Sequence, residues 1–468
     1  MSIFIRSGVC LAVMSALSMA AQAAESTDVG AINVQGETLG GGMMVQEESA
    51  KARSTITKEA MQKQADMAGN ALDRLKYTPG LNVNSNDASG LSGVDYTMRG
   101  MNSDQIGLSI DGIPINDSGN YAVYPNLVGD AENIEEVFVT QGSSEADGPH
   151  IGSSGGNIGL VTKRPAKDFG GFVKQTLGSN NLSKTFARLE TGEYNGFSNW
   201  LSYSHTEAKK WRGEGRLYSN KFEMNSLFEA ENGNSSNLIM KYNRQENANY
   251  NTLSKAQFEQ DGRYANDYPA TPQYNSRGQL SRYYKLNRNP FENFTLSFTQ
   301  KLQLQDNLSL TLQPYYYWGN GGSFTGQSAS TLGPTSDQAG QYDLSNLTSN
   351  TYYRPSWTQT WRPGITTKLK WDINEQHSLD LGYWYERARQ LQTQPYVAIK
   401  SDGNPADLCG DPNGAGQVKD ANGNTVQGRN QYTITPAQKI WLQDSWFVTP
   451  DWTLVGGLAW QHVDRRGE

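Results

Sequence analysis

Apolar and polar residues alternate with a period of two along much of the chain after residue 170. In residues 294–304 the apolar side chains share one parity, and threonine, serine, lysine and glutamine occupy the positions between them. The pattern recurs in residues 308–312, 369–373, 379–385 and 452–460. Because successive side chains of a strand point to opposite faces, this alternation predicts strands with one apolar and one wet face.

The links between these predicted strands alternate in length. Short links are expected near residues 193–196, 231–236, 305–307, 374–377 and 449–451, and the links between them, most of which are long, near residues 179–183, 206–220, 247–290, 319–356 and 391–434. A meander with turns on one side and large polar loops on the other is typical of an outer-membrane barrel, whereas a soluble sandwich has no reason to segregate its links by length. About eleven strands are expected by residue 468.

Two segments precede the first predicted globular unit. Residues 1–23 combine Arg6, an apolar stretch too short to span a bilayer and a small-residue cleavage site, which indicates a signal peptide. Residues 24–54 form a polar tail with one alternating apolar patch at residues 29–35. Such a patch suits addition as a strand to the sheet edge of a partner.

Residues 55–165 are expected to form a small α/β unit. A helix is predicted from Thr57 to Tyr77, where Pro79 and Gly80 follow as a breaker. A tight turn is predicted at Asp111 and Gly112. The predicted strands of this unit are residues 81–84, 96–99, 106–110, 134–140 and 158–162.

Composition and charge remove several functional classes. The sequence has no run of 18 apolar residues, which excludes a helical membrane protein, and its net charge of −7 gives no footprint for nucleic acid. The sequence contains no Ser/His/Asp grouping whose spacing would indicate an enzyme, and its histidines are too scattered to form a metal cluster. The oxygen-rich residues 402–424 lack the spacing and closing glutamate of a calcium loop. After signal-peptide removal Cys409 stands alone, either tolerated in an exposed loop or paired beyond residue 468.

Five ordered motifs carry a resemblance to a known family. Residues 70–83, 96–100, 109–115, 133–139 and 154–165 resemble successive motifs of the plug of TonB-dependent outer-membrane receptors. The sequence departs from the family at Gln141-Gly142, Ile151-Gly152 and Asn157. The resemblance implies an outer-membrane antiparallel β-barrel, of 22 strands when complete, with an N-terminal α/β plug. Residues 170–468 are then expected to hold the N-terminal half of the barrel, with its C-terminal part missing.

The resemblance also implies a function and partners. It implies monomeric, TonB-dependent transport of a scarce small ligand across the outer membrane of a Gram-negative bacterium, with a ferric siderophore as the favoured ligand and no intrinsic cofactor. Cobalamin, a carbohydrate or another small nutrient is the alternative, and an adhesin or phage-receptor role is a more distant one. TonB, with the ExbB-ExbD complex behind it, is expected to pair with a TonB box formed by Val29, Ala31, Ile32, Asn33, Val34 and Gln35.

Two sets of side chains are singled out. Arg99 resembles a buried plug arginine of the family, with Glu135 and Glu136 as its expected partners and an exposed ion pair as the alternative. The expected ligand contacts are aromatic residues and one arginine, from the apical plug segment 116–126 and from one barrel loop: Tyr121, Tyr124, Tyr352, Tyr353, Arg354 and Trp357. For each of them, packing within its own loop is an equal alternative.

Overall fold

The computed structural model describes most of the chain after residue 70. The signal-peptide region, residues 29–35, most of the helix predicted from Thr57 and Cys409 lie outside the described residues. No helix within the described ranges is long and apolar enough to cross a membrane. The described residues are 44–45, 53–57, 70–87, 89–122, 124, 128–142, 146, 148–150, 153–265, 267–276, 280–328, 342–347, 351–407, 414–449 and 452–467.

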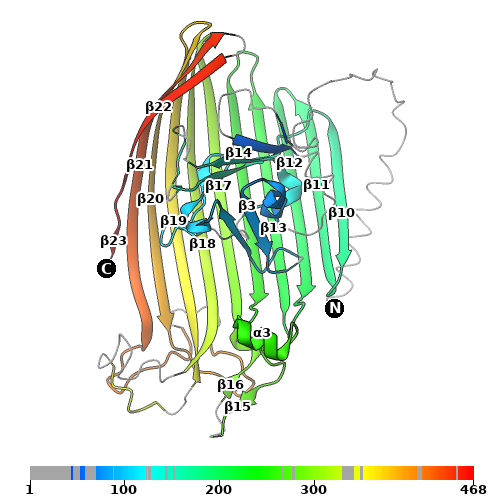
Figure 1. Ribbon diagram of the computed structural model, residues 1–468, viewed down its shortest axis with the longest axis vertical. Coiled ribbons are helices and arrows are strands. Elements are labelled where there is room, and N and C mark those ends of the chain that lie inside the picture. The colour runs from blue at the N-terminus through cyan, green and yellow to red at the C-terminus, as the bar shows by residue number, and fades with distance from the viewer. Residues whose placement is uncertain are drawn as a thin grey trace. The chain divides into compact units, whose positions relative to one another are not determined.

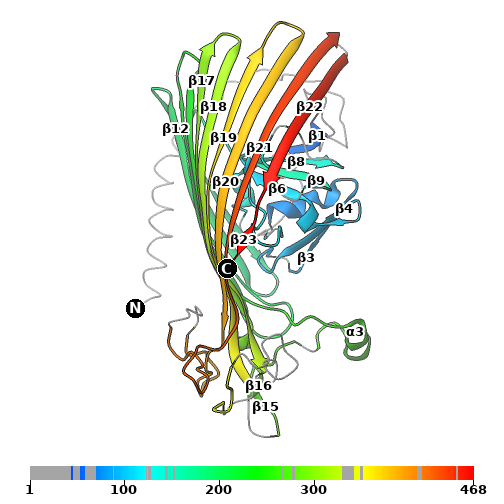
Figure 2. The ribbon, with the colours of Figure 1, turned by 90° about the vertical axis from the view of Figure 1, so that its left-hand side faces the viewer.

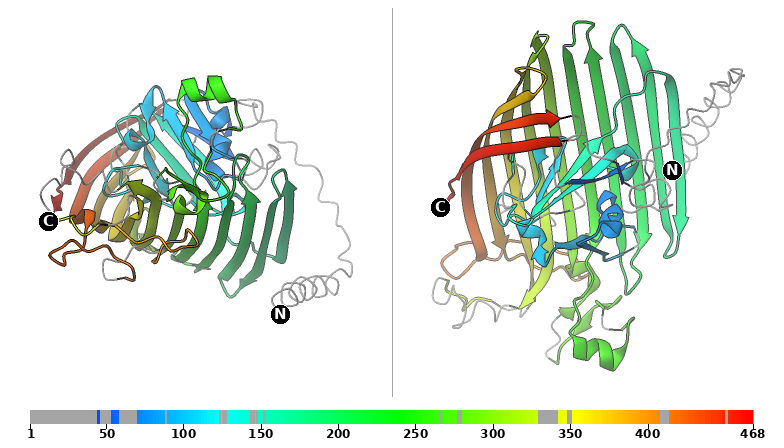
Figure 3. Two further views of the ribbon diagram at one scale, coloured as in Figure 1. Left: turned by 90° about the horizontal axis from the view of Figure 1, so that it is seen from below. Right: turned by 45° about the horizontal axis from the view of Figure 1, so that its top comes forward.

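Eleven antiparallel strands, each paired with the next along the chain, form one curved wall (Figures 1 and 3). This confirms the predicted meander. A short strand, β23 (Arg466–Gly467), pairs with β21 beside the last of them. The eleven are β10 (Phe169–Gly178), β11 (Leu182–Tyr194), β12 (Phe197–Lys209), β13 (Arg216–Glu229), β14 (Ser235–Ala248), β17 (Arg288–Gln305), β18 (Leu308–Ser328), β19 (Thr351–Asp372), β20 (His377–Pro395), β21 (Gln427–Thr449) and β22 (Trp452–Val463).

The long links lie at one end of the wall, as the sequence predicts, although links 179–181 and 210–215 at that end are short. Links of a few residues join β11 to β12, β13 to β14, β17 to β18 and β19 to β20. The opposite end of the wall, lower in Figure 1, carries the long link 249–287 with α3 (Lys255–Asp261), β15 (Gln273–Tyr274), β16 (Leu280–Arg282) and η6 (Tyr284–Leu286). Strands β18 and β19 extend further into this end than predicted. Their ladder continues to the pair Ser328–Thr351, since backbone pairing tolerates the polar and glycine residues that suggested a loop.

One face of the wall carries a row of aromatic side chains. The row is continuous in register across six strands. On the first four of these strands, an aliphatic or methionine side chain lies two residues nearer the short-link end of the wall. Tyr316 and Trp318 belong to this face, whereas Tyr315 and Tyr317 point to the other face and are buried. The row therefore crosses these strands at positions within them rather than at their ends. Its members are Tyr203, Phe222, Tyr242, Phe294, Trp318 and Trp361.

The plug contains two small sheets that lie on the concave side of the wall (Figures 2 and 3). The larger has the order β1 (Met44–Val45), β2 (Arg53–Thr57), β8 (Ile134–Gln141), β9 (Gly156–Thr162), β6 (Gly107–Ile110) and β7 (Ile113–Pro114); the smaller comprises β3 (Leu81–Ser85), β4 (Val94–Met98) and β5 (Met101–Asn102). The 3-10 helices are η2 (Ala71–Tyr77), η3 (Ser103–Gln105) and η5 (Ala131–Asn133).

The plug has an apolar core of its own. Leu72, Leu75, Met98, Val137 and Ile158 are among its fully buried members. The five predicted strands are confirmed within a few residues. Strand β2 was not predicted, because its sequence Arg-Ser-Thr-Ile-Thr offers one apolar side chain, yet it pairs along its whole length with β8.

The predicted turn at Asp111 and Gly112 joins β6 to β7. Both residues have positive φ, 52° and 80°, as a type I′ turn requires. The Asp111 carboxylate accepts hydrogen bonds from the Thr162 backbone nitrogen and hydroxyl, at 2.7 and 2.5 Å. The Asp111 carbonyl accepts one from the Gln313 side chain of β18 at 2.7 Å. A turn predicted from local sequence thus also contacts the wall.

Candidate functional site

A cavity of about 240 Å³ lies between the apical plug segment and the inner face of the wall. Its lining is mostly hydroxyl and amide side chains, with three aromatic rings among them. The plug contributes Ile115, Asp117, Ser118, Asn120 and Tyr124, and the wall contributes Gln245, Asn289, Phe291, Tyr317, Gly321, Gly322, Ser323, Ser356, Thr358, Thr360, Arg362, Gln392 and Arg429. Hydrogen-bonding groups that converge on a concavity suit a small polar ligand.

Hydrogen bonds within the apical segment hold its shape. The buried Asn116 amide accepts from the Leu108 nitrogen at 2.7 Å and donates to the carbonyls of Ile106 and Tyr121 at 2.9 and 3.0 Å. The Asp117 carboxylate accepts from the nitrogen of Gly119 at 2.7 Å. Residues 116–121 of this segment are therefore held in place beside the cavity.

Arg362 anchors this segment to the wall. Its side chain is 2 % exposed, and its Nε and Nη2 donate to the two Glu386 carboxylate oxygens at 3.0 and 3.1 Å. Its Nη1 and Nη2 also donate to the carbonyls of Asn116 and Pro114, each at 2.9 Å. The Tyr315 hydroxyl donates to Glu386 at 2.8 Å. One guanidinium thus joins two strands of the wall to the plug backbone.

Sequence reasoning missed Arg362. A weak signal was present, because Arg362 has the parity opposite to Trp361 and therefore belongs to the inner face of β19. A charged residue there needs a partner inside the barrel.

Arg429 lines the cavity, and a further arginine, Arg354, is its neighbour. Arg429 donates from Nη2 to the Ser356 hydroxyl at 2.9 Å, and the Arg354 side chain passes 3.7 Å from the position that a Cβ on Gly428 would take. The charge of Arg354 acts on Arg429. In both guanidiniums Nε is buried without a hydrogen-bond partner, and within the described ranges neither forms an ion pair. Two adjacent cations without a carboxylate favour an anionic ligand.

The predicted plug contacts divide into two groups. Tyr124 lines the cavity, is 47 % exposed and accepts a hydrogen bond from the Asn120 amide at 3.0 Å. Tyr121 instead packs against a buried cluster that includes Tyr315 and Trp384. The structure therefore places Tyr121 outside the lining of this cavity.

The predicted barrel aromatics pack against side chains of other segments at the same end of the wall. Tyr352 contacts Tyr396, and Tyr353 and Trp357 belong to a cluster around Phe324. Because β19 continues to Thr351, strand parity applies to all of them. Tyr353 and Trp357 have the parity opposite to that of the lining residues 356, 358 and 360, whereas Tyr352 shares the inward parity but is buried against Tyr396. Arg354 has the inward parity.

Buried charges form a second contact between plug and wall. Lys184 of β11, whose side chain is 3 % exposed, lies 2.9 Å from Asp130 and 2.8 Å from Glu132 of the plug. On β13, Glu223 accepts from the Asp130 nitrogen at 2.6 Å and forms an ion pair with Lys241 at 2.7 Å. The carboxylates of Asp130 and Glu132 therefore both form ion pairs with lysine ammonium groups of the wall.

The predicted pair of Arg99 with Glu135 or Glu136 does not form among the described residues. Arg99 is exposed, and its Nε donates to the Gln141 side chain at 3.1 Å, whereas Glu135 accepts from the Arg164 nitrogen at 2.9 Å. The reason is the backbone: Arg99 has φ 49° in the turn between β4 and β5, which directs its side chain to the surface. Other plug charges meet partners in the wall, among them Asp130 and Glu132.

The oxygen-rich loop uses its carboxylates as local caps. Asp402 accepts from the Asn404 nitrogen at 2.9 Å, and Asp420 accepts from the nitrogens of Asn422 and Asn424 at 2.9 and 2.8 Å. These bonds assign Asp402 and Asp420, with the asparagines that follow them, to turn chemistry.

We expect the contact at Asp130 to weaken in acid. Burial alone would raise the pKa of Asp130, but the ammonium groups of Lys184 and Lys221 hold it below its usual 3.8. A carboxylate with a lowered pKa adds stability that is present above its unfolded pKa and is lost as the pH falls through its folded pKa. The urea midpoint should therefore hold down to about pH 4 and fall below it.

The matched control for this prediction is an exposed plug carboxylate. Asp130→Asn removes the titrating group, so its urea midpoint should fall less steeply in acid than that of the wild type. Asp104→Asn should reproduce the wild-type profile, since Asp104 is exposed. Identical acid profiles for wild type and Asp130→Asn would contradict the prediction.

Comparison with known proteins agrees with this architecture. Residues 45–156 match the family described as TonB-dependent Receptor Plug Domain. No curated protein matches the chain. Among solved structures, the ferric citrate transporter FecA in its unliganded form is similar with 19 % identity and a TM-score of 0.66, over 90 % of this chain and 57 % of that one.

Two further solved structures are similar. The siderophore receptor PiuA from Acinetobacter baumannii has 17 % identity and a TM-score of 0.61, over 89 % of this chain and 58 % of that one. The ferripyoverdine receptor of Pseudomonas aeruginosa, bound to ferripyoverdine, has 14 % identity and a TM-score of 0.62, over 91 % and 53 %. The chain spans a little over half the length of these proteins, and at such identities the likeness concerns the fold.

Proposed function

Because the chain has the plug domain and the barrel fold of TonB-dependent receptors, we propose that it takes part in energised uptake of a small anionic ligand across the outer membrane. The observation that carries the anionic class is Arg429, which lines the cavity between plug and wall, together with its neighbour Arg354. The favoured ligand is a ferric siderophore with carboxylate groups. The three similar proteins named above are support, since each is named for a ferric ligand or a siderophore.

A carbohydrate is the second candidate. Ser356, Thr358, Thr360 and Gln392 suit the hydroxyl groups of a sugar, and they are the specific observation in its favour. A neutral sugar, however, leaves Arg354 and Arg429 without an anion. The two candidates therefore differ in whether binding depends on these charges.

We expect Arg354→Gln with Arg429→Gln to weaken binding of an anionic ferric siderophore by roughly 10- to 100-fold, because each charged hydrogen bond is worth about 1.5–3 kcal/mol and part of that persists in the amides. The measurement is the Kd of the purified protein by tryptophan fluorescence, across a panel of ferric siderophores and neutral sugars. Arg263→Gln is the control, since Arg263 lies at the same end of the barrel outside this cavity. Unchanged binding of every anion that the wild type binds would refute the anionic class.

A further inference from the structure

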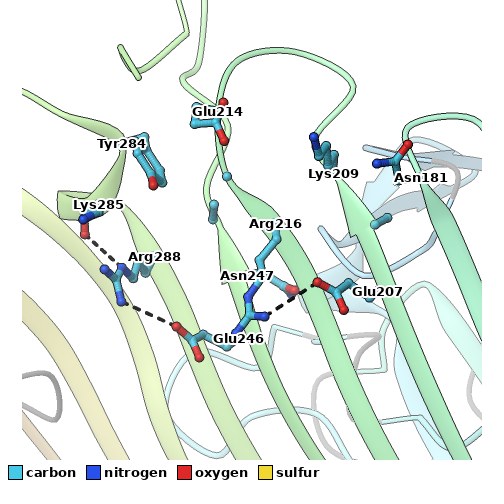
Figure 4. Close-up of a pocket in the computed structure, with 13 residues that line it drawn as sticks. Asn181, Glu207, Lys209, Glu214, Arg216, Glu246, Asn247, Tyr284, Lys285 and Arg288 are labelled. Carbon is cyan, nitrogen blue, oxygen red and sulfur yellow. Dashed lines mark hydrogen bonds and ion pairs between the residues drawn. The ribbon is translucent and has the colours of Figure 1, made fainter. Parts of the chain in front are cut away.

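A second and larger cavity, of about 570 Å³, is lined by charged side chains near the long-link ends of β12, β13, β14 and β17 (Figure 4). Glu207 lies 3.6 Å from Arg216, and Glu246 lies 3.5 Å from Arg288. Both distances are long for ion pairs, and Glu207, Arg216 and Glu246 keep 42–55 % of their side chains exposed. These charges remain available to a ligand.

This cavity opens on the outer face of the wall. Glu207 has the same parity as Leu201 and Tyr203, which are 43 % and 50 % exposed, whereas Ser202 and Ser204 of the opposite parity are buried toward the plug. The cavity is therefore separate from the candidate ligand site. It faces whatever surrounds the barrel.

The aromatic row fixes the height of the cavity. Tyr203 is a member of that row, and Glu207 lies four residues further along β12, about 13 Å at the rise of a strand. With the usual tilt of barrel strands, Glu207 lies about 10 Å from the aromatic row along the barrel axis, toward the long-link end. Aromatic side chains of this kind mark the membrane interface. The cavity lies at the level of lipid headgroups.

The charges of the cavity are mixed in sign. Lys209 adds an ammonium group to the two arginines, and Glu214 adds a third carboxylate to Glu207 and Glu246. Lys285 also lines the cavity, but its ammonium group lies over the Tyr283 ring, 5.5 Å from the ring centre. Within the described ranges, Lys209 and Glu214 form no ion pair. Cations of this kind bind phosphate, while carboxylates accept hydrogen bonds from sugar hydroxyls or hold a bridging divalent cation.

We propose that this cavity binds the phosphorylated sugar headgroup of a lipid in the outer leaflet. The proposal rests on the proposed outer-membrane location, and it concerns a different face of the barrel from the transport site. The proposal is based on two observations. The cavity lies beyond the aromatic row toward the long-link end, and it contains both phosphate-binding and sugar-binding groups. A headgroup seated there would fix the height of these four strands in the membrane.

The test measures retention of bisphosphorylated lipid A by the full protein purified in detergent. Lys209→Gln with Arg216→Gln should lower retention about tenfold, since a basic residue near a membrane surface contributes substantially to anionic lipid binding. The matched control is Arg387→Gln with Arg389→Gln, which removes two exposed charges from the same face of β20 outside the cavity. This control should retain lipid A within about twofold of the wild type.

Two other probes separate the sources of phosphate. Phosphatidylglycerol, which lacks the phosphorylated sugar, should compete weakly, and inorganic phosphate should not displace lipid A. Equal loss in both double variants, or equal competition by phosphatidylglycerol, would overturn the proposal. Siderophore uptake should be unchanged in Lys209→Gln with Arg216→Gln, so a failure here is distinguishable from a failure of the transport proposal.

Discussion

Replacing Ile32 with proline should reduce energised ligand uptake at least tenfold while leaving the Kd of the ligand unchanged. A strand added to a partner's sheet edge binds through its backbone hydrogen bonds, and proline removes one donor and its local conformational freedom. Residues 29–35 lie outside the described residues, so the box remains a proposal from sequence. The measurement is uptake of radiolabelled ferric siderophore by whole cells, paired with binding to the same cells after de-energisation.

A matched replacement separates pairing from tail length. Exchanging residues 29–35 for a Gly-Ser segment of equal length should reproduce the loss, whereas the same exchange of residues 36–42 should preserve uptake. Normal uptake in the Ile32→Pro cells would rule out strand pairing at this patch. Loss of binding together with uptake would instead point to misfolding of the variant.

Glu386→Ala should destabilise the folded protein by about 3–5 kcal/mol, because it leaves the buried Arg362 guanidinium without its carboxylate. The same change removes the acceptor of the Tyr315 hydroxyl. The measurement is urea-induced unfolding of the full protein in detergent, followed by tryptophan fluorescence.

A double variant tests whether the cost comes from the uncompensated charge. Arg362→Met with Glu386→Leu removes both charges and should recover most of the lost stability, since a buried pair is often replaceable by apolar residues. Glu375→Ala, in the exposed turn between β19 and β20, should change stability by less than about 0.5 kcal/mol. A loss of stability that is no smaller in the double variant than in Glu386→Ala would refute this account.

The strands of the wall were predictable because the exposure of their side chains is periodic. In strand β20 every second side chain from Leu381 to Arg389 is exposed, so such alternation is visible in the sequence without knowledge of the neighbouring strands. The lengths of the links then indicated that consecutive strands pair as a meander. The turn at Asp111 and Gly112 was predictable for a local reason as well, since both positions need positive φ.

The candidate site was less predictable because it depends on contacts between distant segments. Arg362 lies 246 residues from the carbonyl of Asn116 that it binds, and no local pattern joins the two. The aromatic residues Tyr353 and Trp357 were assigned to a loop, and that assignment removed the parity rule that places them away from the cavity. Arg99 was assigned by likeness to a family, while its own turn geometry directs it outward.

The contact between plug and wall differs in kind from the core of the plug. Leu72, Leu75 and Val137 hold the plug together through apolar burial, whereas Asp130 and Lys184 hold it to the wall through charge-assisted hydrogen bonds. When water enters such a contact it replaces each broken hydrogen bond with one of its own, so little free energy is lost once the groups are wet. A force that separates plug from wall would therefore meet its greatest resistance while the contact is still dry. Peeling from one edge, which admits water bond by bond, would need a smaller peak force than lifting the whole plug at once.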